Sequence, residues 1–163
     1  MIKITHVHPM LVHFPIVLFL TAFVLLGYAQ IKKEDLASRS CLSVTAISAL
    51  ILATVFAIGA AIFGDIALDA ALDKGFPKGP LEEHEMLAGV TITIFSILSL
   101  VVIVSLWKRF SMTGGRGWGF LGVAFVGLVM LISTAYHGGE LVYKHGVNVE
   151  EISIDKSKAA GSG

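Results

Sequence analysis

The chain has 163 residues, of which 55% are hydrophobic and only 15% are charged, whereas soluble domains carry about 25% charged residues. Its 12 basic and 12 acidic residues balance, so no basic surplus favours nucleic-acid binding, and the high hydrophobic content excludes a disordered chain. The single cysteine, Cys41, excludes a disulfide framework, a four-cysteine metal site and covalent haem attachment through a CxxCH motif. These properties predict a small integral membrane protein.

Four apolar runs without charged residues follow one another, over residues 10–31, 42–64, 86–107 and 118–136. Each is close to the roughly 20 residues that a helix needs to cross a hydrocarbon core of about 30 Å. The connections are short, so consecutive helices are expected to be antiparallel. We therefore predict an all-α integral membrane protein, an up-down four-helix bundle with short loops. It forms one domain over residues 1–149, and the polar residues 150–163 are expected to form a flexible C-terminal tail.

The basic residues of the first and third connections predict the orientation in the membrane. These residues are Lys32, Lys33, Arg39, Lys108, Arg109 and Arg116. Because cytoplasmic loops retain lysine and arginine, both connections are expected in the cytoplasm, with both termini outside. The second connection, over residues 68–84, is rich in glycine and proline and is expected to be turn-rich.

All histidines fall on the predicted outer side. They are His6, His8, His13, His84, His137 and His145. Neutral imidazoles from facing helices of a bundle can bind iron, copper or zinc. His13 interrupts an apolar run and is expected to face the bundle interior. His84 precedes the third helix and His137 ends the fourth, and these three are the main candidate ligands, with His8 and His145 in reserve.

Other interpretations of these histidines stay open. His13 could be a buried neutral side chain bonded to a carbonyl that Pro9 or Pro15 leaves free. His84 could be a solvated residue at a helix start. Two carboxylates at the same level, Asp65 and Glu140, could orient a ligand histidine or join a metal site. Asp65 could equally mark the end of its helix at the water boundary.

The histidines support two kinds of site. Two facing histidines can hold the iron of a b-type haem without covalent attachment, and Lys144 could then pair with a haem propionate. A compact set of His13, His84 and His137 could instead bind a zinc or copper ion. The residues alone do not decide between them. No G-x-S-x-G elbow occurs, and we predict no catalytic residue.

Two segments carry a resemblance to a known family. Residues 8–15, HPMLVHFP, resemble the HPxxVHFP signature of a bacterial membrane domain family of unknown function. Residues 138–147, GGELVYKHGV, are similar to its closing GGxLVYxHGVxV motif. Asp65 and His84 stand where that family has an acidic residue and a histidine, whereas Asn148 replaces a frequent glycine. The resemblance spans residues 6–149 and implies a four-helix integral membrane protein.

The resemblance also suggests a redox role, because relatives are sometimes fused to, or encoded beside, Rieske iron–sulfur or cytochrome c domains. We therefore expect a haem b protein of the bacterial inner membrane, with both termini in the periplasm. It would act in electron transfer or as a redox accessory subunit, more as a binding protein than as an enzyme. A zinc-, copper- or iron-binding membrane protein and a structural or assembly subunit are the alternatives, and homo-oligomerisation is left open.

Overall fold

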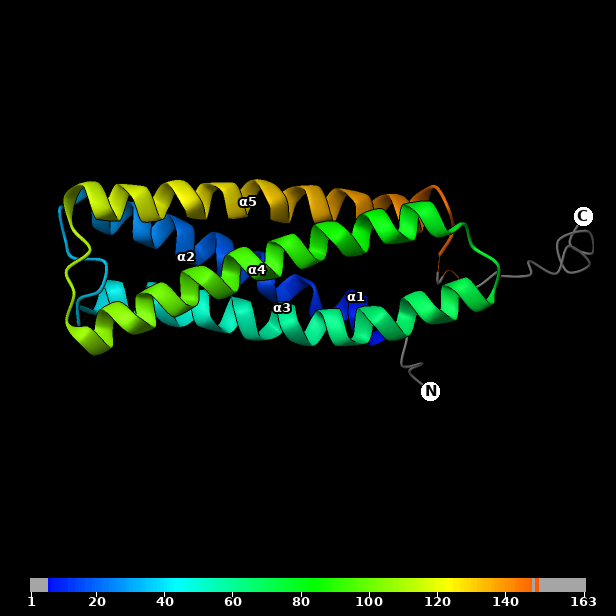
Figure 1. Ribbon diagram of the computed structural model, residues 1–163, viewed down its shortest axis with the longest axis horizontal. Helices are drawn as coiled ribbons and strands as arrows, with labels where there is room; N and C mark the ends of the chain where they lie inside the picture. The colour runs from blue at the N-terminus through cyan, green and yellow to red at the C-terminus, as the bar shows by residue number, and fades with distance from the viewer. Residues whose placement is uncertain (1–5, 148, 150–163) are drawn as a thin grey trace, which may run out of the picture.

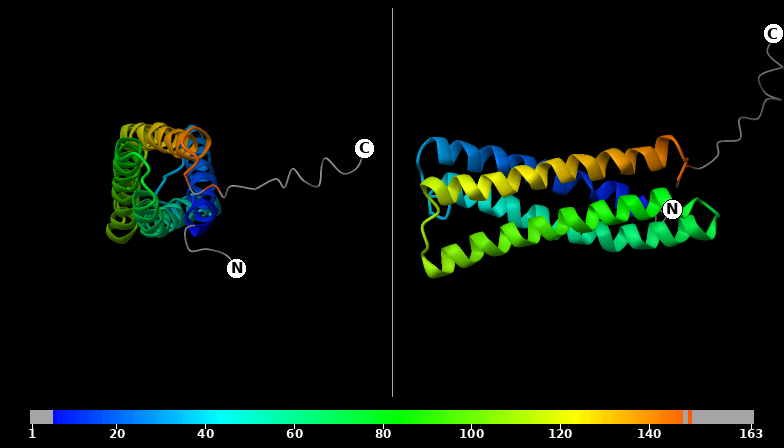
Figure 2. Two further views of the ribbon diagram at one scale, coloured as in Figure 1. Left: turned by 90° about the vertical axis from the view of Figure 1, so that its right-hand side faces the viewer. Right: turned by 45° about the horizontal axis from the view of Figure 1, so that its top comes forward.

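The computed structural model describes residues 6–147 and 149 of the chain. It contains five helices: α1 (Val7–Leu11), α2 (His13–Ile31), α3 (Cys41–Asp73), α4 (Lys78–Lys108) and α5 (Gly114–Tyr143). Helices α2 and α4 each contact both α3 and α5, so the four long helices form a closed ring that is square when seen end-on (Figures 1 and 2). The predicted all-α, up-down four-helix bundle is confirmed. The expected tail, 150–163, lies outside the described residues.

The first membrane span is interrupted near its start. Helix α1 and helix α2 are separated only by Val12, and together they form a span over Val7–Ile31. Pro15 explains the break, because proline has no N–H to donate to the carbonyl of Leu11 and its ring crowds that carbonyl. The interruption lets α1 pack on α3 as a separate short helix (Figure 1).

Three helices extend further at one end than the apolar runs predict. Helix α3 continues to Asp73, α4 begins at Lys78, and α5 continues through its double glycine to Tyr143. The expected turn-rich connection over 68–84 was wrong, since only residues 74–77 lie between the helices. A second apolar cluster holds these extensions together, with Ala71, Leu81, Leu141 and Val147 buried at its centre. In this segment the apolar residues recur at helical spacing, and their burial keeps the chain helical despite its glycines and prolines.

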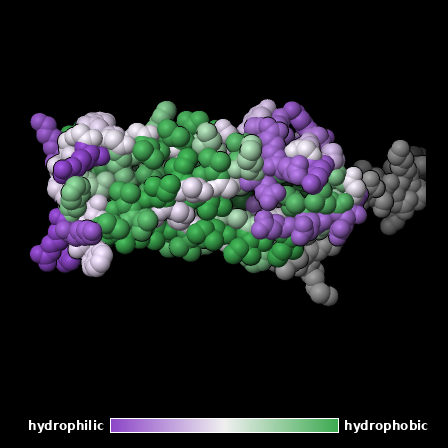
Figure 3. Space-filling model, viewed as in Figure 1, coloured by the Kyte–Doolittle hydropathy of each residue, from purple (hydrophilic) through white to green (hydrophobic). Residues whose placement is uncertain are grey.

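The surface of the bundle has the form of a membrane-spanning protein. Four helices are long and apolar enough to cross a membrane, and an apolar belt separates two polar ends (Figure 3). On α5, Trp118 and Tyr136 are 57% and 62% exposed. They lie about 27 Å apart at 1.5 Å per residue, close to the thickness of a hydrocarbon core of about 30 Å. Because exposed Trp and Tyr gather at membrane interfaces, the helix extensions beyond Tyr136 lie at the water boundary.

The two ends of the bundle carry different residues. We call the end with loops 32–40 and 109–113 the basic end, and the opposite end the histidine end. At the basic end, Asp35 ties the two loops together, because its Oδ1 accepts hydrogen bonds from the backbone N–H groups of Ala37 and Met112, both at 2.9 Å. The Ser43 hydroxyl adds a hydrogen bond to the Asp35 carbonyl at 3.0 Å. The loops at this end therefore form one hydrogen-bonded unit.

Acid is expected to weaken this unit. Burial opposes the ionisation of Asp35, but hydrogen bonds from Met112, Ala37 and Ser111 outweigh it and lower its pKa. The bonds therefore stabilise the fold above the unfolded-state pKa of about 3.9 and are lost as pH falls through the folded-state value. We expect Asp35→Asn to lower the thermal midpoint in detergent at about pH 6, and the difference from wild type to shrink towards about pH 3. An equal difference at both pH values would contradict this assignment.

Candidate functional site

Three of the histidines at the histidine end come from three different helices. His8 lies on α1, His84 on α4 and His137 on α5, and we call them the histidine cluster. The rings of His8 and His84 are neighbours, with centroids 6.3 Å apart and planes at 87°. The cluster therefore combines residues that are far apart in the sequence.

The ring of His8 is held against α3. Its Nδ1 lies 2.7 Å from the carbonyl oxygen of Ala60. Since a carbonyl only accepts, Nδ1 carries the proton and Nε2 of the neutral ring keeps its lone pair. Gly64 makes this position available, because a Cβ there would lie 3.0 Å from His8 Nδ1.

The ring of His84 is held against α5. It faces the backbone of Thr134, and it packs on Gly138, where a Cβ would lie 2.9 Å from His84 Cε1. Its Nδ1 is buried and has no hydrogen-bond partner among the described residues. Buried polar atoms are nearly always paired in native proteins, so this nitrogen calls for an explanation.

One local arrangement occurs twice. In each case a histidine ring faces the backbone of a helix residue, and a glycine lies one turn further along the same helix: Ala60 with Gly64, and Thr134 with Gly138. A helix carbonyl points towards the residue four positions later. A glycine at that position removes the side chain that would cover the carbonyl, so a ring from another helix can reach it.

His137 completes the cluster at the water boundary. Its Nδ1 lies 2.8 Å from the carbonyl oxygen of Ser133, and its Nε2 lies 3.5 Å from Glu83 Oε1. The side chains of His137 and Glu83 are 29% and 59% exposed. His8 and His137 are thus each bonded to a backbone carbonyl through Nδ1. Ligand histidines of metal sites are oriented by the same kind of bond, which fixes the tautomer and leaves the second nitrogen for the metal.

His13 does not face the interior as expected, because its side chain is exposed. The core-facing residues of α2 are Pro15, Phe19, Ala22 and Leu26. Successive residues of a helix are rotated by about 100°. His13 lies two positions before Pro15 and therefore points about 200° away from the core-facing residues. The expectation for His13 is corrected accordingly, and the structure does not bring it into the histidine cluster.

The remaining predicted site residues lie at the same end without joining the cluster. Asp65 and His145 are exposed. Glu140 pairs with Lys144 one turn later, and this hydrogen bond raises the pKa of Lys144 above its ordinary value. The carboxylate that approaches the cluster is that of Glu83, which sequence reasoning did not single out.

The cluster offers two close ring ligands rather than three. Among the described residues, no group of three or more His, Cys, Asp or Glu side chains is arranged to hold a metal ion. A three-histidine zinc or copper site from His13, His84 and His137 is therefore not assembled. His8, predicted as a reserve ligand, lies in the cluster, whereas the sequence analysis did not single out Gly64 or Gly138.

Comparison with known proteins gives one match. The model of a protein family described as "Predicted membrane protein (DUF2231)" matches residues 5–151. No curated protein and no solved structure matches the chain.

Proposed function

We propose that this chain, which belongs to the DUF2231 family of predicted membrane proteins, binds a b-type haem between His8 and His84 at the histidine end. Membership confirms the resemblance inferred from the two end motifs. The observation that carries the proposal is His84 Nδ1, a buried ring nitrogen without a partner among the described residues, beside a second ring that also has a free nitrogen. An iron ion would supply the partner that this nitrogen lacks.

The number of ligands favours haem over a bare ion. A porphyrin supplies four nitrogens and needs only two from the protein, whereas zinc sites use three or four protein ligands. The rings of His8 and His84 have centroids 6.3 Å apart, so these two neighbouring side chains would be the protein ligands of the haem.

Bound haem would supply one-electron chemistry, and the residues of the chain would hold and tune it. The carbonyl of Ala60 would orient the ring of His8 through its hydrogen bond, and Gly138 would position the ring of His84 by direct packing. Such bonds also raise ligand basicity and so tune a reduction potential. We do not assign Lys144 to a propionate, since Glu140 already pairs with it. Redox partners of Rieske or cytochrome c type would dock at this end, and the protein would act as an electron carrier rather than an enzyme.

The spectrum of the purified protein tests the proposal. After expression with haem supplied, we expect a Soret band that shifts on adding dithionite. His84→Ala and His8→Ala are each expected to remove most of this band, whereas His13→Ala, at an exposed position, is expected to keep it. Absence of the band from the wild-type protein would refute haem binding, and equal loss in all three variants would refute the ligand assignment.

A bare transition-metal ion is the second candidate, favoured by the close packing around the rings. A Cβ at Gly64 or Gly138 would lie only 3.0 Å or 2.9 Å from a histidine atom, so both rings rest directly on backbone. In this case copper or zinc would appear in stoichiometric amount by elemental analysis, without a Soret band, and would be lost in His84→Ala. If neither group is bound, the histidines serve as hydrogen-bonding anchors between helices, as a structural subunit would require.

The lipid bilayer surrounds the four spans, and we propose that the basic end faces the cytoplasm of a bacterial inner membrane. The two loops of this end carry Lys32, Lys33, Arg39 and Arg109, whereas the connection over 74–77 at the opposite end carries Lys74 alone, in accordance with cytoplasmic retention of lysine and arginine. The histidine end and both termini would then face the periplasm.

Chemical labelling of Cys41 tests this orientation. It is the only cysteine of the chain, it is exposed, and it begins α3 at the basic end. We expect a membrane-impermeant maleimide to label Cys41 only after the membrane is permeabilised. Lys74→Cys in a Cys41→Ser background places a thiol at an exposed position of the opposite end and is expected to react in intact cells. The reverse pattern would invert the proposed topology.

A further inference from the structure

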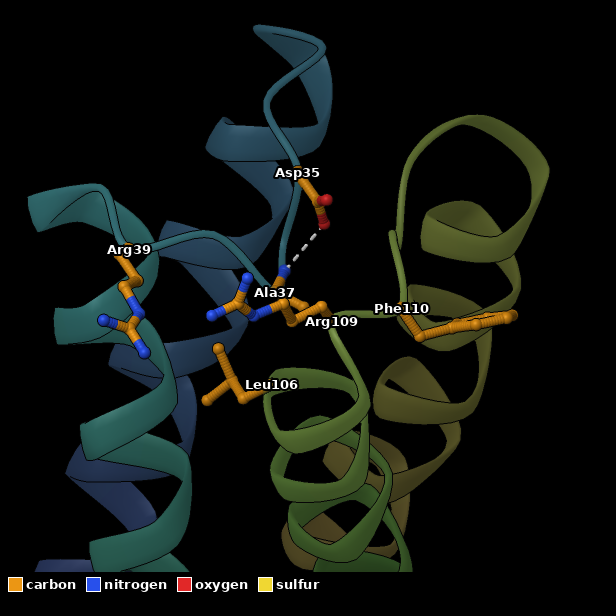
Figure 4. Close-up of a pocket in the computed structure, with 6 residues that line it drawn as sticks. All are labelled: Asp35, Ala37, Arg39, Leu106, Arg109 and Phe110. Atoms are coloured by element: carbon orange, nitrogen blue, oxygen red, sulfur yellow. Dashed lines mark hydrogen bonds between the residues drawn. The ribbon is translucent and has the colours of Figure 1, made fainter.

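A cavity of about 420 Å³ opens at the basic end, away from the histidine cluster. It is lined by the loop between α2 and α3, by the end of α4 and by the residues that follow α4. Figure 4 shows Arg39 and Arg109 reaching from these two loops towards the same space above Leu106. Two guanidinium groups from separate loops therefore face one cavity.

Both guanidinium groups are available to a ligand. No ion pair among the described residues involves Arg39 or Arg109. The carboxylate at the rim, Asp35, turns towards the backbone (Figure 4) and accepts the N–H groups of Ala37 and Met112. Arg116, by contrast, is already stacked on Phe110, with its guanidinium carbon 4.5 Å from the ring centroid. Among the described residues, the cavity is thus lined by two guanidinium groups without an ion-pair partner and by one carboxylate that bonds the backbone.

The backbone of Arg109 is unusual for an arginine. It ends α4 in the left-handed conformation, with φ 53° and ψ 41°. Glycine is the usual residue at this position of a helix end, because a Cβ is disfavoured there. Backbone strain of this kind concentrates at ligand sites. An arginine in this conformation turns its guanidinium towards Arg39 across the cavity, which a glycine could not do.

The depth of the cavity and its apolar neighbour indicate the class of ligand. Trp107, beside Arg109, is 81% exposed, as expected of a tryptophan at the membrane interface. A second cavity, of about 430 Å³, adjoins at Phe110 and continues along α4 past Lys108, Val104 and Leu100 towards the middle of the span. A basic site at headgroup depth therefore lies next to an apolar groove.

We infer that Arg39 and Arg109 bind the phosphate of an anionic phospholipid, with the lipid body against the apolar end of α4. Arginine suits this role because its planar fork binds phosphate oxygens in pairs. Basic pockets between helices on the cytoplasmic side are typical sites for acidic headgroups. Phosphate is the chemistry that both a lipid and a free anion would present, and the depth of the site and the adjoining groove favour the lipid.

Native mass spectrometry of the detergent-purified protein tests the inference with phosphatidylglycerol as the probe. At about 1 kcal/mol per arginine, Arg39→Gln and Arg109→Gln are each expected to weaken retention about fivefold, and together about 25-fold. Lys32→Gln with Lys33→Gln removes two charges from the same end, outside the cavity lining, and is expected to leave retention unchanged. If the double arginine variant does not fold, lipid retention is compared between the two single variants, the wild type and the lysine control.

Three results would overturn the inference. Equal retention of phosphatidylcholine would show that the acidic headgroup is not recognised. Equal loss in the lysine control would reduce the effect to general charge attraction. Displacement of the lipid by millimolar inorganic phosphate, with binding of phosphate alone to the same arginines, would assign the cavity to a free anion.

Discussion

Replacing Gly117 by alanine is expected to destabilise the bundle by about 1–3 kcal/mol, the usual range for overpacking a well-packed site. A Cβ at Gly117 would lie 2.8 Å from the backbone carbonyl oxygen of Met112 and 2.7 Å from Cδ of Gln30. The Gln30 side chain cannot turn away freely, because its Nε2 donates to the carbonyl of Gly114 at 3.0 Å. The start of α5 would therefore have to move from the basic-end loops.

Gly119 is the matched control for this change. It lies two positions later on the same helix, and a Cβ there would meet nothing within 4 Å. Gly119→Ala is expected to be neutral or to stabilise the helix by up to about 1 kcal/mol through helix propensity. Thermal unfolding of the two variants in the same detergent measures the difference. A Gly117→Ala midpoint equal to that of Gly119→Ala would mean that α5 does not approach the loops as closely as described.

The number and order of the helices could be predicted from the sequence because hydropathy directly reports contact with lipid. The ends of the helices could not, since beyond the membrane a helix is set by packing as well as by composition. The segment around Leu81 contains Gly79 and Pro80, which indicate a turn, yet proline is tolerated in the first turn of a helix. The burial of Leu81 against Ala71 and Leu141 depends on tertiary contacts that no local pattern contains.

Which histidines lie together could be predicted only in part, for a similar reason. The up-down order of the helices places the histidines at one end of the bundle, where His84 and His137 lie beside His8. His13 was preferred to His8 because it stands inside an apolar run, but exposure to lipid and burial in protein give the same local hydropathy. The groups that position the His8 and His84 rings belong to helix backbone uncovered by Gly64 and Gly138. A backbone carbonyl has no signature in side-chain sequence, so only the coordinates reveal it.

Gly138→Ala is expected to weaken haem binding roughly tenfold or more, the scale seen when groups that orient a metal ligand are disturbed. A Cβ at Gly138 would lie 2.9 Å from Cε1 and 3.4 Å from Nδ1 of His84. The ring would therefore have to move away from α5, and its unpartnered nitrogen would move with it. Haem titration followed by the Soret band measures the affinity, and a shifted reduction potential would report any haem that is still bound.

Gly139→Ala is the control that separates weaker haem binding caused by the displaced His84 ring from the effect of replacing either glycine of the pair by alanine. A Cβ at Gly139 would meet nothing within 4 Å, so this variant is expected to keep the affinity and the spectrum of wild type. Both substitutions exchange a helical glycine for alanine, and their propensity effects therefore cancel in the comparison. Only Gly138 touches His84, so weaker binding in Gly138→Ala alone would assign the difference to the position of that ring. Equal behaviour of the two variants would exclude His84 as a ligand held in this place.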